Sequence, residues 1–172
     1  LDKSNEFELL AKAQKIALLI FFFSINFEVW DPFYTDGNFS IARLTGLIYF
    51  FTLIPEIRKF VGTASIGPFL MPIWFLFGFL TLVSFININA LSNVFFNLSL
   101  FQNIFLFWFL LNHERKEPSI LEKGMLSFAF GSILLALLYS AGIGVEYKGG
   151  RATIFDDNAN SLGLRMGFSI MI

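Results

Sequence analysis

Residues 124–144, GMLSFAFGSILLALLYSAGIG, form a long run without a charged side chain. The hydrocarbon core of a bilayer is about 30 Å thick, and a helix needs about 20 apolar residues to cross it. This stretch therefore predicts a transmembrane helix. The same criterion finds four further segments along the chain. It also finds the start of a sixth, which begins near Ser161 and stops at Ile172. The five predicted spans are residues 12–30, 41–57, 67–88, 94–112 and 124–144.

The composition agrees with a membrane protein. Hydrophobic residues make up 56% of the chain, aromatic residues 19% and charged residues 15%, and the mean hydropathy is +0.69. Soluble domains average about 45–50% apolar and about 25% charged residues. We therefore expect an all-α, polytopic transmembrane helix bundle in contact with membrane lipids.

The same composition excludes several other classes. The net charge is −1 and there is no long basic run, so the chain gives no indication of nucleic-acid binding. It has no cysteine and a single histidine, His113, which excludes disulfides, thiolate metal sites and histidine clusters. We predict neither a metal nor another cofactor.

Lysine and arginine residues are unevenly divided between the loops that join the predicted spans. If the spans alternate, the larger group lies on the side of the N-terminus, and the positive-inside rule puts that side in the cytoplasm. The loops at 31–40, 89–93 and 145–160 would then face outward. The larger group is Lys3, Lys12, Lys15, Arg58, Lys59, Arg115, Lys116 and Lys123, and the smaller is Arg43, Lys148 and Arg151.

Short loops predict one transmembrane domain over residues 1–172, with no soluble domain and no linker. The chain begins at Leu1 rather than Met and stops inside an apolar run. We therefore expect it to be the N-terminal part of a longer multi-pass protein.

The stretch GGRATIFDDNANSLG at 149–163 is polar and charged between two apolar stretches, which indicates a functional surface. The fork of an arginine such as Arg151 binds a phosphate at two points. Asparagine side chains hydrogen-bond sugar hydroxyls. Arg151, Asp157, Asn158 and Asn160 are therefore the candidate substrate-binding residues. A structural alternative stays open, in which Asn160 or Ser161 caps the sixth helix and the aspartates favour its positive end.

Three more polar or small features accompany this stretch. Arg165 stands about one turn inside the sixth apolar segment, where it either snorkels to the interface or faces a polar cavity in the bundle. Gly163 and Gly167 have a G-x-x-x-G spacing, which allows the close approach of another helix. His113 falls in a charged inner loop, and we expect it to be solvated.

At 149–163 the chain resembles the O-antigen ligase and O-antigen polymerase family of bacterial membrane glycosyltransferases. In that family an outward loop carries an arginine, a short aromatic stretch and a motif close to N-P-N that leads into a helix. The matching residues are Arg151, Thr153-Ile154-Phe155 and Asn158-Ala159-Asn160, with alanine at the usual proline position.

The resemblance implies a multi-pass protein of the bacterial inner membrane. It implies transfer or polymerisation of an undecaprenyl-pyrophosphate-linked glycan onto another glycan or a lipid A-core acceptor at the outer face, as in lipopolysaccharide biosynthesis, without a metal. The family's catalytic histidine loop would follow Ile172, so no catalytic residue is assigned here, and His113 lies on the wrong side to serve as that base. The alternative function is a secondary transporter or a flippase for lipid-linked oligosaccharides, and a non-enzymatic scaffold is a third possibility.

Overall fold

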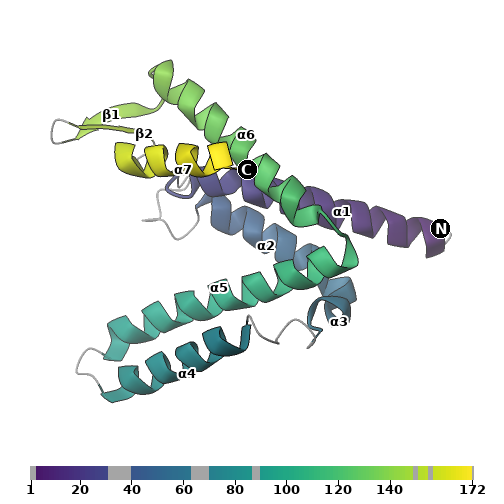
Figure 1. Ribbon diagram of the computed structural model, residues 1–172. Coiled ribbons are helices and arrows are strands. Elements are labelled where there is room, and N and C mark those ends of the chain that lie inside the picture. Colours follow the sequence, from purple (N-terminus) through teal and green to yellow (C-terminus); the bar gives the residue numbers. More distant parts are fainter. Residues whose placement is uncertain are drawn as a thin grey trace. The chain divides into compact units, whose positions relative to one another are not determined.

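The structure is a computed structural model that describes residues 3–30, 40–62, 70–86, 90–148, 151–154 and 157–171. The chain divides into two compact units. Unit 1 contains Leu1–Pro55 and Ile120–Ile172, and unit 2 is Glu56–Ser119. Each unit is described by itself, and Figure 1 shows the elements of both. The prediction of a single transmembrane domain remains a prediction.

Unit 1 is built around α1 (Lys3–Ser24), which packs against both α2 (Ile41–Leu53) and α6 (Ile120–Ser140) (Figure 1). A short 3-10 helix, η1 (Ile25–Phe27), continues α1 and also contacts α2 and α6. The final helix, α7 (Ala159–Met171), packs on α6. Glycines let these helices approach closely. An added Cβ at Gly46 would come within 3.1 Å of the Phe21 ring, and one at Gly124 within 3.0 Å of the Phe22 ring.

The distribution of polar and apolar residues on the two faces of α6 is the reverse of that on a surface helix of a water-soluble protein. Its buried residues include Gly124, Gly131 and Ser132, together with two aliphatic residues. Between Glu122 in its first turn and Ser140 at its end, the exposed residues are large and apolar, with Phe130 at 68% and Leu137 at 62% exposure. Small and polar residues facing other helices, with bulky apolar residues facing outward, are typical of helices in lipid. At about 1.5 Å per residue, the helix is also about 30 Å long, enough to cross a bilayer.

The prediction of five spans and the start of a sixth is wrong. Helices do occupy the predicted segments, but within the described residues only α6 is long and apolar enough to cross a membrane. The first half of α1 carries charged residues, and α2 ends at Leu53, before a 3-10 turn at Ile54–Glu56 that contains Pro55. A shorter apolar helix runs over Met71–Ser84.

The chain is also not purely helical, because the expected outward loop at 145–160 contains a small sheet. Strands β1 (Val145–Lys148), β2 (Arg151–Ile154) and β3 (Asp157–Asn158) are antiparallel, in the order β1-β2-β3. Gly142, at φ 73°, takes the left-handed conformation that commonly ends a helix. This glycine ends α6 and turns the chain into β1.

Unit 2 contains α3 (Ile57–Phe60), α4 (Met71–Ile86) and α5 (Ala90–Lys116). The helices α4 and α5 pack side by side (Figure 1). Their contact is aromatic, since Trp74 of α4 meets Phe101 and Trp108 of α5 edge to face, with ring centroids 6.0 and 6.5 Å apart. Asparagines and a glutamine interrupt the apolar residues of α5.

Candidate functional site

The predicted substrate-binding residues lie on one strand-to-helix segment, formed by β2, β3 and the start of α7. The backbone of Arg151 pairs with Lys148, and those of Asp157 and Asn158 pair with Ile154 and Thr153. Asn160 lies in the first turn of α7. The side chains of Arg151, Asp157, Asn158 and Asn160 lie outside the described part of the structure, so their contacts with a substrate stay predictions.

An apolar cluster anchors this strand-to-helix segment to unit 1. Ile154, the last residue of β2, is only 1% exposed and packs in one core cluster with Phe27 of η1 and Leu135 of α6. Phe23 and Tyr139 are among the partly buried residues around them. Burial of an isoleucine of this kind contributes roughly 1.5–3 kcal/mol. The strand is therefore fixed to the helices at its C-terminal end.

A buried polar cluster lies beside this core, centred on Asn26, which is 1% exposed. Its side-chain amide donates to the main-chain oxygen of Phe128 at 2.8 Å, and its Oδ1 accepts from the Ser132 hydroxyl at 2.6 Å. Gly131 provides the space, because a Cβ there would lie 2.5 Å from the Asn26 nitrogen and 2.7 Å from the Phe23 carbonyl oxygen. A buried amide needs such partners, since an unsatisfied polar group costs about 1–3 kcal/mol.

Arg165 of α7 joins this cluster. Its guanidinium donates to the main-chain oxygen of Asn26, and the residue is half-buried. Because Asn26 bonds to Phe128 and Ser132, the Arg165 contact lies level with the middle of α6. Of the two sequence interpretations, this geometry agrees with Arg165 turned towards polar groups in the bundle. An arginine at the centre of a membrane span costs roughly 2.5–3.5 kcal/mol on insertion scales, so an arginine turned into a helix bundle needs an acceptor.

The interpretation of Asn160 or Ser161 as the N-cap of α7 is wrong, because the helix begins at Ala159, before both residues. An added Cβ at Gly163 or Gly167 would meet no described atom within 4 Å, so the close approach of another helix to these glycines stays a prediction.

His113 is not solvated, contrary to expectation. It lies in the last turn of α5, is 2% exposed and meets the Phe60 ring edge to face at 5.3 Å. Burial lowers its pKa to about 4, an effect that nearby Lys116 reinforces and Glu117 and Glu114 oppose. The ring is therefore neutral near pH 7. Its packing on Phe60 accounts for its position structurally.

Glu56 lies between the start of α3 and the C-terminal end of α5 in unit 2. Its carboxylate pairs with Lys59 and, at 2.5 Å, with Lys116, whose ammonium also lies 4.8 Å from the Phe60 ring centroid. Hydrogen bonds from Lys116 and Lys59 lower the pKa of Glu56 to about 2. Nearby, the Asn112 amide donates to the Phe60 carbonyl oxygen at 2.8 Å. These contacts hold α3 against the end of α5.

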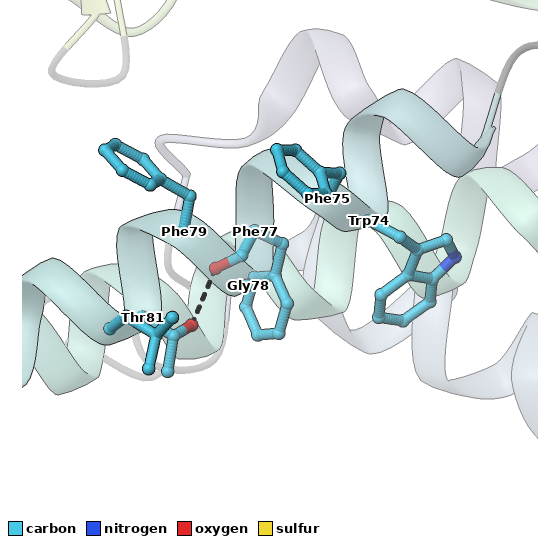
Figure 2. A pocket seen from close by; sticks show the side chains of 7 residues that line it. Trp74, Phe75, Phe77, Gly78, Phe79 and Thr81 are labelled. Carbon is cyan, nitrogen blue, oxygen red and sulfur yellow. Dashed lines mark hydrogen bonds between the residues drawn. The ribbon is translucent and has the colours of Figure 1, made fainter.

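An apolar concavity of about 550 Å³ lies on α4, and every described residue that lines it comes from that helix. Figure 2 shows the rings of Trp74, Phe75, Phe77 and Phe79 along it. The single hydroxyl, of Thr81, donates to the Phe77 carbonyl oxygen at 2.8 Å. The concavity offers no group for acid, base or nucleophilic chemistry. The described residues also contain no group of histidines, cysteines and carboxylates that could hold a metal ion.

Sequence reasoning did not identify Asn26 or Ser132. Each is a single polar residue in an apolar stretch, and their pairing spans more than one hundred positions along the chain. The pattern that could have indicated them is the small-residue stripe of α6, formed by Gly124, Ser127, Gly131 and Ser132, which marks the helix face turned towards a neighbour.

Comparison with known proteins adds no family to this geometry. No family model, curated protein or solved structure matches the chain.

Proposed function

We propose that this chain belongs to a membrane glycosyltransferase of the O-antigen ligase or polymerase type. The enzyme would transfer or polymerise a glycan carried on undecaprenyl pyrophosphate. Its acceptor would be another glycan or a lipid A core. The protein would reside in the bacterial inner membrane with its N-terminus in the cytoplasm and would act at the outer face.

One observation carries the proposal. A helix long and apolar enough to cross a membrane, α6, leads within a few residues into the polar strand-to-helix segment that bears Arg151, Asp157 and Asn158. The apolar helix and the polar segment would match the two chemically different parts of a lipid-linked sugar. The apolar face of α6 suits a polyprenyl tail, and polar residues just beyond the helix suit the pyrophosphate and the first sugars.

The chemistry needs little beyond charge and position. A pyrophosphate is already a good leaving group, so transfer of the sugar requires stabilisation of the negative charge that develops on it and a positioned acceptor hydroxyl. Arg151 would supply the charge as a two-point phosphate ligand. Asp157, Asn158 and Asn160 would bind sugar hydroxyls. This chemistry does not require a metal ion.

Arg151→Ala in the full protein tests the proposal. We expect at least about a tenfold loss of transferred or polymerised glycan at unchanged protein level, because a charge-assisted hydrogen bond contributes about 1.5–3 kcal/mol. Arg58→Ala is the matched control, since it removes an exposed arginine of α3 outside the proposed site. Equal glycan ladders in the two variants would contradict the proposal.

One observation favours the alternative function, a secondary transporter or a flippase for lipid-linked oligosaccharides. Transporters place charged side chains near the bilayer midplane, and Arg165 contacts Asn26 level with the middle of α6. Vesicles that contain the full protein and a fluorescent lipid-linked oligosaccharide distinguish the two functions. Movement of the label across the bilayer without glycan transfer supports the transporter, and transfer without movement supports the glycosyltransferase.

A further inference from the structure

We infer that η1 positions the strand-to-helix segment, and that Arg165 and Ile154 are the positioning residues through which it acts. The role of that segment in substrate binding rests on the proposed function, but the positioning itself is a property of the fold. It assigns a task to a turn of three residues that lies far from the segment in sequence.

Two contacts of opposite chemistry meet on neighbouring residues of η1. The first is polar, because the Arg165 guanidinium donates to the main-chain oxygen of Asn26. The second is apolar, because Ile154 packs on Phe27 in the core cluster with Leu135. Ile154 precedes β3, and Arg165 lies in α7, which follows it. The segment with Asp157, Asn158 and Asn160 is therefore held at both of its ends by one turn.

The turn is itself tightly fixed. The Asn26 side chain bonds to Phe128 and Ser132 of α6, and the Trp30 amide donates to the Phe27 carbonyl oxygen at 3.0 Å. Both Asn26 and Phe27 are buried. A rigid turn transmits its position to whatever is attached to it, so the attachment of α7 and β2 to η1 fixes where the substrate segment lies over the helices. Without that attachment, the segment would be held only by its own short strands and by the packing of α7 on α6, which does not fix β3.

A spectroscopic experiment tests the positioning without any assay of activity. Residues 1–172 contain no cysteine, so paired cysteines carry spin labels at chosen sites only, once any cysteine elsewhere in the full protein has been replaced by serine. Phe168→Cys with Ile133→Cys reports the distance from α7 to α6, and both positions are 54% exposed. Ile16→Cys with Leu126→Cys reports the α1–α6 distance as a control. The measurements use the full protein in lipid nanodiscs.

In Arg165→Ala we expect the α7–α6 distance distribution to broaden, while the α1–α6 distribution stays unchanged. Arg165→Lys retains one donor and should restore part of the narrow distribution. An Arg165→Ala distribution as narrow as that of the parent protein overturns the inference. If Arg165→Ala fails to fold, Ile154→Val offers a milder test of the other anchor. A broadened α7–α6 distribution in that variant supports the inference, and an unchanged one overturns it.

Activity then separates the inference from the proposed function. If both hold, Arg165→Ala raises the apparent KM for the polyprenyl-pyrophosphate-linked glycan about tenfold and changes kcat less, because substrate binding is weakened while the chemical step keeps its groups. A broadened α7–α6 distribution with unchanged KM and kcat supports positioning and contradicts substrate binding by the segment.

Discussion

Units 1 and 2 both join helices, but by different means. In unit 1, glycines and small hydroxyl residues bring helix backbones together, and single hydrogen bonds cross between them, as between Ser127 and the Leu19 carbonyl oxygen at 2.8 Å. In unit 2, rings meet edge to face, and charged residues tie the helix ends around Glu56. Helices in lipid associate through close approach of their backbones, because the hydrophobic effect does not drive helix association there. Ion pairs and a buried histidine instead make a unit sensitive to pH.

The largest effect expected from this difference is a pH dependence in unit 2. His113 has its usual pKa of about 6.5 in the unfolded chain and about 4 in the folded one, so the unfolded state binds more protons between these values. The free energy of unfolding of unit 2 should therefore fall as the pH drops from 6.5 to 4. The full loss is on the order of 3 kcal/mol, at 1.36 kcal/mol per pKa unit.

Hydrogen exchange of α5 amides between pH 4 and 7, corrected for intrinsic rates, measures this loss. His113→Phe keeps a ring against Phe60 and removes the titrating imidazole, so its protection should vary much less with pH across the window, with a small change left near pH 4 from Glu56. Amides of α1 and α2 in unit 1, which contain no histidine, are the internal control. A parent α5 as independent of pH as the variant would contradict the prediction.

Unit 1 should instead respond to steric change. In Gly131→Ala the new methyl group would lie 2.7 Å from the Phe23 carbonyl oxygen and 2.5 Å from the Asn26 amide nitrogen, so the backbone or the polar cluster must move. We expect a loss of about 1–3 kcal/mol in the free energy of unfolding. Gly163→Ala, in open space on α7, is the matched control and should stabilise by up to about 1 kcal/mol. Thermal unfolding in detergent compares the two, and equal midpoints would show that the α1–α6 contact is looser than described.

The same contrast explains what the sequence could predict. Apolar segments marked where helices form, because hydropathy reports which residues avoid water. It did not establish how many helices cross a membrane, since that depends on where each helix ends: Pro55 follows the end of α2, and α4 ends at Ile86. The segments that form β1 and β2 were expected to be a loop. Each strand has only four residues, and a stretch of that length is too short for an alternating polar and apolar pattern to be recognised.

For the site, a polar stretch after an apolar helix could be recognised, but its anchors could not. The contact between Arg165 and Asn26 joins residues 139 positions apart, and nothing in either local sequence indicates the other. His113 illustrates the opposite error. Its charged neighbours Glu114, Arg115 and Lys116 predicted a solvated loop, whereas α5 continues through them to Lys116 and turns the imidazole onto Phe60.

The smallest predicted effect concerns the ion pairs of unit 2. It distinguishes their contribution to stability from that of His113. Glu56 has a folded pKa of about 2 against a usual 4.5, so its stabilisation is complete above pH 4.5 and is lost as the pH falls towards 2. At pH 7 Glu56→Gln should cost no more than about 1 kcal/mol, because Lys59 is 57% exposed and such pairs are screened by solvent.

Salt gives the decisive measurement for Glu56. Raising the ionic strength from about 0.1 to 1 M shortens the Debye length from about 10 to about 3 Å, which should shrink the difference between Glu56→Gln and the parent protein while leaving the effect of His113→Phe in place. A Glu56→Gln difference that persists in 1 M salt would mean that the carboxylate acts through fixed hydrogen bonds rather than through charge. Unit 2 would then resemble unit 1 in depending on directed polar contacts, and the distinction between the two units would rest on His113 and the aromatic rings alone.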